Sequence, residues 1–477
     1  MTVNRKTVFF LVLLLLASNL ITFWVTGNYY CTAEQEDEQL PEPAAVEPEI
    51  PEDLKPFLEV LEILSERYID KVSREDLINE AINGMVGSLN DPQTSFFEAS
   101  DWEEMMIKIE GSFSGIGVNI ISVDNYITVV SPIKNTPGER AGFLPGDRII
   151  AVDGVNIVGK TTTEAVSLMR GPEGTPVTLT VERNGLPEPL TITLVRENIE
   201  MPSVFPEMDE QGIGYIQITS FSENTGNNFR EALLELEAQN MRGLILDLRD
   251  NPGGLLNEAI IVGQEIIPPG IITRTVDGEG NVLKTYLSYG TEKEYPIVVL
   301  VNGFSASAAE IISGALQDTG AGVLVGTKTY GKATVQHLER IAGNRGLSYT
   351  VAKYQTPKGR DIHGNGLEPD YHVELPTDIY FVRYQLFNDL SAGDEGATVL
   401  ILQKKLKAMK YDVEETAIFD RQTEKALRTF QESYGLPVTG QLDQATRTVL
   451  SRVMEDVADD LDKQLQKART VILEMLN

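Results

Sequence analysis

The chain has 477 residues and a formal net charge of −31 at pH 7, and because its length exceeds what one hydrophobic core usually organises, several domains are expected. The negative charge argues against nucleic acid as a partner, since phosphates bind basic surfaces, and against adhesion to anionic lipid through basic patches. One cysteine and three histidines exclude an internal disulfide and favour no metal site or other cofactor.

The first segment, residues 1–30, carries the apolar run VFFLVLLLLASNLITFWV behind the basic pair Arg5 and Lys6. The run is near the length that crosses a bilayer, and the basic flank favours a cytoplasmic N-terminus. A cleaved signal peptide is the alternative, but the run is long and no small-x-small cleavage site follows it. We expect a single-pass membrane anchor with the rest of the chain on the extracytoplasmic side, or a secreted protein if the segment is cleaved.

Residues 31–54 are acidic and proline-rich, which is typical of a disordered, self-repelling spacer. Residues 55–108 form a helical segment. Its first helix, PFLEVLEILSERYID, repeats apolar residues on one face, and a second helix is expected around residues 77–89. Packing or pairing of two copies is the expected role of this segment, so a homodimer is one interpretation.

Residues 109–196 change to short strands separated by turns. GIGVNIIS and YITVVSPI read as apolar strands, Asp153-Gly154 marks a turn, and TPVTLTVERNGLPEPLTITLVR reads as a hairpin. TTTEAVSLMRG reads as a helix between them. The pattern predicts a compact β domain.

Residues 197–380 alternate strands and helices, as in GIGYIQITSF, NNFREALLELEAQ, GLILDLR and PIVVLVN. This βαβ pattern predicts a mainly parallel sheet covered by helices. Residues 388–455 are helical with glycine turns, and residues 456–477 form a further helix. The expected fold class is therefore multidomain α/β and α+β: a membrane helix, a helical segment, a β domain, a βαβ-rich core and a small helical C-terminal domain.

Ser307 stands between the strand PIVVLVN and the helix that begins at SASAAEIISGALQ. Unpaired backbone N–H groups at a helix start favour developing negative charge, which suits a nucleophile. Serines also cap helices routinely. The segment alone leaves both interpretations open.

Lys332 lies in TKTYGKATVQHL, between a glycine and small residues. Lysines usually lie on surfaces, but a buried lysine loses its proton more easily and can act as a base. Gln336, four residues later, could orient the amine. His337 is the rival base, although neighbouring residues of a strand face opposite sides.

Gly253 and Gly254 directly follow the predicted strand GLILDLR. Glycines at this place let a backbone N–H approach a ligand closely. A simple turn is the alternative interpretation.

Five segments in order, GYIQITSF, GLILDLRDNPGGLL, NGFSASAAEIISGALQD, GTKTYGKATVQ and TPKGRDIHGNGLEPD, resemble the carboxyl-terminal processing (tail-specific) proteases. The resemblance covers about residues 57–376. It implies Ser307 as the nucleophile, Lys332 as its base 25 residues later, and Gln336 as the residue that orients the base.

The same resemblance implies an oxyanion hole made of the backbone N–H groups of Gly253 and Ala308. Ser305 then becomes a capping or wall residue. Asp318 matches an acidic residue that some members need, but it could equally end the helix structurally. SASAAE stands where SASASE is common, a departure that we expect to be harmless.

The β domain resembles a PDZ domain, and the resemblance implies that a peptide's free C-terminal carboxylate binds at Gly115, Ile116, Gly117 and Val118 while the peptide adds a strand. Arg170 resembles the family's arginine that links this domain to the active site, but a surface arginine at a helix end is an equal alternative. The C-terminal part resembles a peptidoglycan-binding-like module, and the match indicates fold more firmly than ligand.

These observations predict a membrane-anchored serine endopeptidase that acts on protein C-termini outside the cytoplasm, without metal. Its expected partners are proteins or peptides with free C-termini, the membrane and peptidoglycan, and not nucleic acid. Two alternatives stay open. One is a non-catalytic, wall-associated scaffold that binds peptides through its PDZ domain; the other is a Ser/His hydrolase that uses His337.

Overall fold

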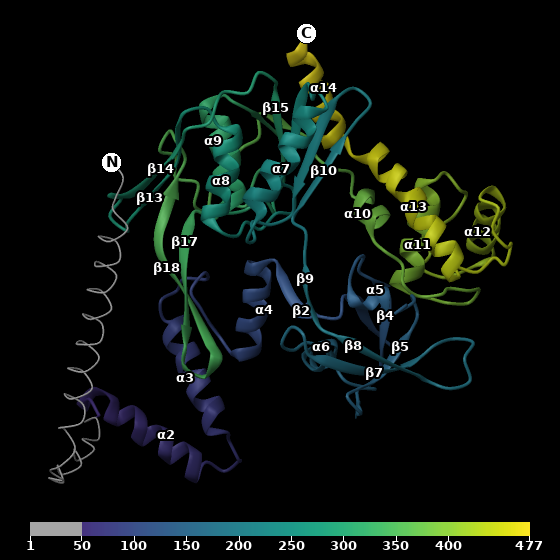
Figure 1. Cartoon of the computed structure of the whole chain (residues 1–477), viewed down its shortest axis with the longest axis horizontal. Helices are drawn as coiled ribbons and strands as arrows, with labels where there is room; N and C mark the ends of the chain where they lie inside the picture. Colours follow the sequence, from purple (N-terminus) through teal and green to yellow (C-terminus); the bar gives the residue numbers. More distant parts are fainter. Residues whose placement is uncertain (1–49) are drawn as a thin grey trace, which may run out of the picture. The chain divides into compact units, whose positions relative to one another are not determined.

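A computed structural model describes residues 50–477 of the chain (Figure 1). The predicted membrane helix, residues 1–30, and most of the predicted spacer lie outside the described residues. Within residues 50–477 none of the helices combines the length and hydropathy needed to cross a bilayer. The contacts divide the chain into two units, Met1–Ala81 and Ile82–Asn477.

The described part of the first unit is helical. It contains η1 (Glu52–Leu54), α2 (Lys55–Arg67) and the beginning of α3 (Arg74–Gly87). On α2, Leu61 is buried, whereas Phe57 and Val60 of the same predicted apolar face are exposed. The apolar face of this helix is therefore only partly covered by the described residues.

The second unit begins with a segment that joins the N-terminal helices to the β domain. The sequence analysis included most of it in the helical segment, residues 55–108. Beyond α3, the chain forms the short strand β1 (Ser95–Phe97), the helix α4 (Ala99–Glu110) and the strand β2 (Ser112–Gly115). β2 pairs with β9 (Glu197–Glu200), so the chain enters and leaves the β domain side by side.

The β domain is an antiparallel sheet with strand order β3-β4-β5-β7-β8, and β6 (Val155–Asn156) pairs with β5. Its strands are β3 (Val118–Val123), β4 (Tyr126–Pro132), β5 (Arg148–Val152), β7 (Pro176–Glu182) and β8 (Leu190–Val195), with the helices α5 (Pro137–Arg140) and α6 (Thr162–Met169). Alternate residues such as Ile127, Ile149 and Leu179 are fully buried, so the period-2 pattern fills one core.

The main sheet of the α/β core has the order β10-β11-β12-β15-β16-β19, parallel except for β10 against β11. The strands are β10 (Val204–Met208), β11 (Ile213–Ile218), β12 (Gly243–Asp247), β15 (Ile297–Val301), β16 (Val323–Gly326) and β19 (Tyr371–His372). Every residue of β12 and β15 is buried, as expected for strands that are covered on both faces.

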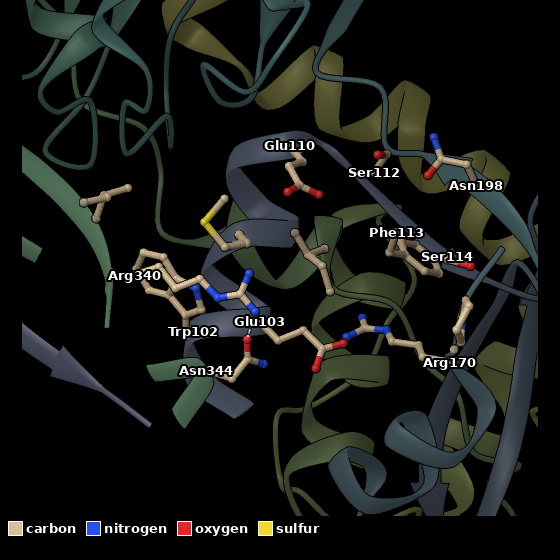
Figure 2. Close-up of a pocket in the computed structure, with 15 residues that line it drawn as sticks. Trp102, Glu103, Glu110, Ser112, Phe113, Ser114, Arg170, Asn198, Arg340 and Asn344 are labelled. Carbon is tan, nitrogen blue, oxygen red and sulfur yellow. Dashed lines mark hydrogen bonds between the residues drawn. The ribbon is translucent and has the colours of Figure 1, made fainter. Parts of the chain in front are cut away.

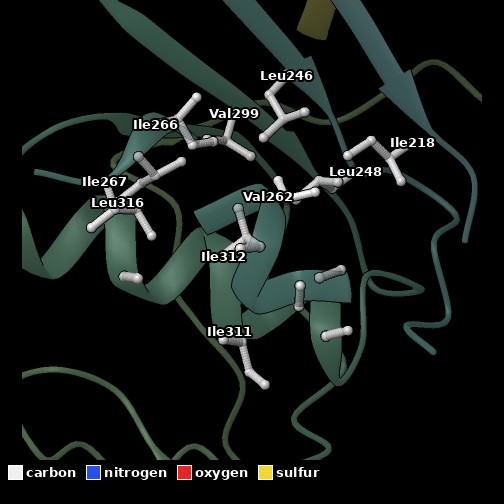
Figure 3. Close-up of a cluster of buried hydrophobic side chains, with 14 of the residues drawn as sticks. Ile218, Leu246, Leu248, Val262, Ile266, Ile267, Val299, Ile311, Ile312 and Leu316 are labelled. Atoms are coloured by element: carbon white, nitrogen blue, oxygen red, sulfur yellow. The ribbon is translucent and has the colours of Figure 1, made fainter. Parts of the chain in front are cut away.

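Three helices cover one face of this sheet: α7 (Thr225–Ala238), α8 (Leu256–Ile266) and α9 (Ala308–Thr319). Figure 3 shows side chains of α8 and α9 packed against side chains of the strands. The buried contacts come from Val262, Ile266, Ile312 and Leu316 on the helices and Leu246 and Val299 on the strands. The packing fixes the start of α9, and with it Ser307, against the end of the sheet.

A second, antiparallel sheet belongs to the same unit and was not anticipated from the sequence. Its order is β1-β18-β13-β14, and β17 pairs with β18. The strands are β13 (Gly270–Val276), β14 (Val282–Ser288), β17 (Thr334–Ile341) and β18 (Arg345–Gln355), with the turn η2 (Ala342–Asn344) between the last two. Because β17 begins just after Lys332, this sheet holds the predicted base in place.

The C-terminal region contains the helices α10 (Asp378–Arg383), α11 (Ala397–Ala408), α12 (Arg421–Ser433), α13 (Gln444–Leu461) and α14 (Lys463–Leu476). Two buried glutamines occupy equivalent places in it. The Gln403 amide donates to Thr416, Ile418 and Thr423, and the Gln431 amide donates to Thr439, Gln441 and Thr446. The module is thus organised around an internal repeat of a helix, a loop and a capped helix.

The last helix, α14, leaves this module and returns to the main sheet, where it lies beside β15 (Figure 1). Its apolar side, including Ala468 and Ile472, packs with Ile245, Val298 and Leu300 of the strands. The helix thus covers the sheet face opposite α8 and α9. The helical module is therefore an insertion between two parts of the α/β core.

A buried ionic network fixes the beginning of α14. Asp462 caps the helix and accepts hydrogen bonds from the Arg249 guanidinium at 2.8 and 2.9 Å. Arg249 also pairs with Asp247 at 2.6 Å, and all three side chains are almost completely buried. Since Arg249 immediately precedes the Asp250–Gly254 loop, the network ties the last helix to that loop.

Candidate active site

Ser307 stands at the N-terminal end of α9, directly after the loop that leaves β15. Its backbone has φ 55° and ψ −115°, a region that residues with a side chain rarely adopt. Such strain persists only where the surroundings enforce it, and it is concentrated at functional sites. The geometry therefore singles out Ser307 among the serines of this segment.

Glu310 holds Ser307 and Lys332 in one hydrogen-bond cluster. Its carboxylate accepts the backbone N–H of Ser307 at 2.9 Å, that of Lys332 at 2.9 Å and that of Gly331 at 2.8 Å, and the Thr329 hydroxyl at 2.6 Å. Glu310 is completely buried. Although burial raises the pKa of the Glu310 carboxyl, four donors oppose that shift by stabilising the carboxylate.

Tyr354, on β18, joins the same two residues from the carbonyl side. Its hydroxyl lies 3.0 Å from the Ser307 carbonyl oxygen and 2.6 Å from that of Lys332. Burial raises the pKa of the Tyr354 phenol well above its ordinary value, so the hydroxyl keeps the proton that it donates. Sequence reasoning missed both Tyr354 and Glu310, and the signal that could have drawn attention to Glu310 is the S-x-x-E pattern of a capping box.

Lys332 lines a cavity of about 580 Å³ beside the nucleophile loop, with Gln93, Asp250, Pro252, Phe304, Ala306 and Tyr330 as the other lining residues. Burial lowers the pKa of the Lys332 amine, and the nearby negative charge of Asp91 acts in the opposite direction. Its amine has neither a hydrogen bond nor an ion pair within residues 50–477. A half-buried amine without a partner is suited to accept a proton.

The side chain of Gln336 is held by hydroxyl groups. Its Nε2 donates to Thr334 Oγ1 at 2.9 Å and to Thr350 Oγ1 at 3.3 Å. The predicted role of orienting Lys332 stays a prediction. His337 is exposed and packs edge-on against the Tyr349 ring at 5.4 Å, so β17 directs the two neighbours to different surroundings.

The two backbone N–H groups predicted to form the oxyanion hole differ in the hydrogen bonds that they make. The Ala308 N–H is the first of α9 and has no acceptor among the described residues, whereas the Gly253 N–H donates to Asn251 Oδ1 at 2.8 Å. Gly253 does lie against the nucleophile: a Cβ there would be 2.7 Å from Ser307 Cβ. Use of its N–H in an oxyanion hole would require the Asn251 bond to be shared or released.

The hydroxyls of the other serines in this segment are already engaged. Ser305 is completely buried, donates to the Leu248 carbonyl at 2.7 Å and accepts the Asn302 N–H at 2.9 Å. Ser313 donates to the Ala309 carbonyl within the helix. These bonds fit structural roles.

Asp318 lies near the end of α9 and is tied to the loop that follows β18. It pairs with Arg360 at 2.7 Å and accepts the Lys358 N–H at 2.8 Å. Both contacts join the helix to that loop. They fit a structural task for Asp318, and within residues 50–477 neither of them reaches Ser307.

The predicted carboxylate-binding residues join β2 to β3. Gly115 ends β2, Val118 begins β3, and the backbone N–H groups of Ile116 and Gly117 have no backbone acceptor in the described chain. β3 is an edge strand of its sheet and lies beside α6. Free donors next to an open edge strand can bind a terminal carboxylate while the peptide pairs with the strand.

Arg170, at the end of α6, faces a separate cavity of about 820 Å³ between the β domain, α4 and the tip of the β17–β18 hairpin. Figure 2 shows Arg170 and Glu103 extending toward each other across it. The Arg170 guanidinium lies 5.2 Å from the Phe113 ring, and its Nε is buried without a partner in the described residues. The structure brings Arg170 to the junction between the two domains, and the link to the active site stays a prediction.

Four family models match the chain. Peptidase family S41 matches residues 212–373, a PDZ domain matches residues 128–183, and a peptidoglycan binding domain matches residues 395–450. The model of the activating protease CtpB N-terminal domain matches residues 15–100. These matches confirm the resemblance that the motifs indicated.

Whole-chain relatives agree with the models. The carboxy-terminal processing protease CtpA of Bacillus subtilis is 36% identical over 404 residues, which cover 84% of this chain and 86% of the relative. A carboxy-terminal-processing protease of Bartonella bacilliformis is 40% identical over 326 residues, covering 67% and 75%. The solved photosystem II D1 C-terminal processing protease is 29% identical, with a TM-score of 0.41, and covers 69% of this chain and 96% of its own. The chain belongs to the carboxy-terminal processing serine proteases of family S41.

Proposed function

We propose that this carboxy-terminal processing serine protease uses Ser307 as its nucleophile and Lys332 as its general base. The observation that carries the assignment is the double tether: Glu310 accepts the N–H groups of both residues, and the Tyr354 hydroxyl contacts both carbonyls. Two segments 25 residues apart are thus held together around a half-buried amine. The strained backbone of Ser307 supports the same assignment.

In the proposed reaction, the Ser307 hydroxyl attacks the peptide carbonyl carbon while neutral Lys332 takes the hydroxyl proton. The Ala308 N–H, joined by that of Gly253 once it is free, stabilises the oxyanion. The Lys332 ammonium then protonates the leaving amine as the C–N bond breaks. Water attacks the resulting ester while Lys332 takes one of its protons, and Lys332 then gives that proton to the Ser307 oxygen as the ester C–O bond breaks and the new carboxyl terminus leaves.

The substrate is proposed to enter by its C-terminus. The unpaired N–H groups of Ile116 and Gly117 and the open edge of β3 support binding of a free carboxylate. Amidating a peptide substrate removes that charge. The amidated peptide should therefore have a clearly higher KM than the free acid.

The N-terminal apolar run supports a membrane anchor with the protease on the extracytoplasmic side, and the matched C-terminal module supports contact with peptidoglycan. The partly uncovered face of α2 supports a homodimer. Membrane fractionation with protease protection, sedimentation with purified peptidoglycan, and analytical ultracentrifugation test these three proposals separately.

The decisive experiment is cleavage of an unstructured protein with an apolar C-terminus by wild type, Ser307→Ala and Ser305→Ala. Ser307→Ala should be inactive and folded, and Ser305→Ala should keep part of the activity. A wild-type protein that binds C-terminal peptides but never cleaves them would favour a peptide-binding scaffold. Activity in Ser307→Ala would reject the nucleophile.

A further inference from the structure

A short strap before α4, residues 91–97, docks onto the hairpin that carries the catalytic lysine. It begins with a local turn in which Asp91 accepts the Gln93 N–H at 3.0 Å and the Thr94 hydroxyl at 2.7 Å. It continues as β1, which pairs with β18 from Ser95 opposite Ser348 to Phe97 opposite Gly346. The strap therefore comes from outside the S41-matched residues yet forms one edge of the second sheet.

The Asp91 carboxylate reaches across to β18. Thr350 Oγ1 donates to Asp91 Oδ2 at 2.6 Å, and Gln336 Nε2 donates to Thr350 Oγ1 at 3.3 Å. A carboxylate that fixes the direction of one hydroxyl leaves that oxygen's lone pairs for the amide. Asp91, Thr350 and Gln336 thus form a directed chain of hydrogen bonds.

The strap also reaches the cavity that contains the lysine. Gln93 and Lys332 line the same space of about 580 Å³. The negative charge of Asp91 raises the pKa of the Lys332 amine and so opposes the effect of burial. One carboxylate therefore serves both members of the base assembly.

We propose that Asp91 is a positioning residue for catalysis: its carboxylate is the electrostatic partner of the Lys332 ammonium and, through Thr350, the anchor of the Gln336 amide. The inference rests on the proposed Ser307–Lys332 mechanism and adds to it a residue from the strap.

Other charged or titratable groups face this assembly. Asp250 and Tyr330 line the Lys332 cavity, and Glu310 accepts the Lys332 backbone N–H. His363 Nδ1 accepts the Ala333 N–H at 3.4 Å and exerts a charge effect on Asp91. Because these groups can also titrate, the pH profile of activity has to be accompanied by a direct measurement of the ionisation of Lys332.

The first measurement follows the lysine itself. In a Ser307→Ala background, the pH dependence of Lys332 acetylation by acetic anhydride is read by mass spectrometry. Asp91→Asn keeps an oxygen that can accept from Thr350 but removes the charge, so half-maximal acetylation should move to lower pH by roughly half a unit or more. Asp91→Glu, which retains the charge, should stay closer to wild type.

The second measurement follows turnover in the Ser307 enzyme. The acid limb of kcat/KM should move to lower pH in Asp91→Asn, in the same direction as the acetylation curve. Thr350→Val breaks the chain to Gln336 and keeps the charge, so kcat should fall several-fold while the limb stays in place. Asp412→Asn, an exposed carboxylate of the helical module, is the control and should match wild type.

The outcomes separate this inference from the proposed function. An Asp91→Asn acetylation curve that superimposes on that of the parent, or moves to higher pH, overturns the role of Asp91 even if the enzyme cleaves normally. A wild-type enzyme without Ser307-dependent cleavage overturns the mechanism, while the acetylation curves still decide whether Asp91 and Lys332 interact. Circular dichroism of each variant verifies that it is folded.

Discussion

Replacement of Glu310 by glutamine tests whether one buried carboxylate holds the nucleophile and the base in register. The substitution keeps the shape of the side chain but turns one acceptor oxygen into a donor. If Oε2 became the amide nitrogen, it would face the N–H groups of Ser307 and Lys332. If Oε1 did, it would face the Gly331 N–H and the Thr329 hydroxyl.

The second orientation costs less, because the Thr329 hydroxyl can turn and accept while the Ser307 and Lys332 bonds remain, now to a neutral oxygen. Only the Gly331 N–H is then left without an acceptor. An unsatisfied buried donor costs about 1–3 kcal/mol, and bonds to a neutral oxygen are weaker than bonds to a charged one. We expect Glu310→Gln to lower the free energy of unfolding of the core by roughly 2–4 kcal/mol.

The loss of activity in Glu310→Gln should exceed the loss that follows from a smaller fraction of folded enzyme. Small displacements at a reacting centre are costly, so kcat should drop about 10- to 100-fold with KM little changed. Peptide cleavage and scanning calorimetry measure the two effects. The matched control is Glu235→Gln on the exposed side of α7, which should change stability by less than about 0.5 kcal/mol. Wild-type kcat together with an unchanged unfolding transition in Glu310→Gln would refute the reasoning.

Three further predictions follow from the site and its supports. Burial lowers the pKa of Lys332, and the base must be neutral, so kcat/KM should rise with pH, with a midpoint below the ordinary pKa of a lysine. Lys332→Arg should be inactive because arginine keeps its proton, and an active arginine variant would exclude this base. Gly253→Ala should cut kcat at least 10-fold, because the glycine has φ +98° and a Cβ would approach Ser307 Cβ to 2.7 Å; wild-type cleavage rates would show that the loop is not packed against the nucleophile. Asp462→Asn should destabilise the core by about 3 kcal/mol, because Arg249 would lose a buried partner charge, and denaturant unfolding that matches wild type would contradict it.

Much of the core could be predicted because its signals are local. The runs GLILD and IVVLV are apolar throughout, as strands covered on both faces must be, and the serine after the second run lies where the pattern placed it. The same pattern placed Gly253 and Gly254 after the first of these strands, and the structure has them in the loop beyond β12, with positive φ. Local sequence also located Lys332 just ahead of a strand.

The parts that escaped prediction depend on contacts between distant segments. Strand β14 is exposed over most of its length, so its sequence lacks the apolar pattern that would have indicated a second sheet. Asp91 and Thr350 are 259 positions apart and meet only because β1 pairs with β18. Glu310 looks like an ordinary acidic residue of a first helical turn, and its four donors appear only when the Thr329–Lys332 segment folds over it.

The return of α14 to the main sheet has a consequence for how the enzyme is made. During synthesis the nucleophile and the base emerge before the inserted helical module, and the module emerges before the helix that covers the opposite face of β12 and β15. A chain that has not yet formed α14 therefore possesses Ser307 and Lys332 while one face of its sheet is uncovered and Arg249 lacks its Asp462 partner. We therefore expect the core to reach its full stability only after α14 has been added, because this helix supplies both the apolar cover of the sheet and the partner of Arg249.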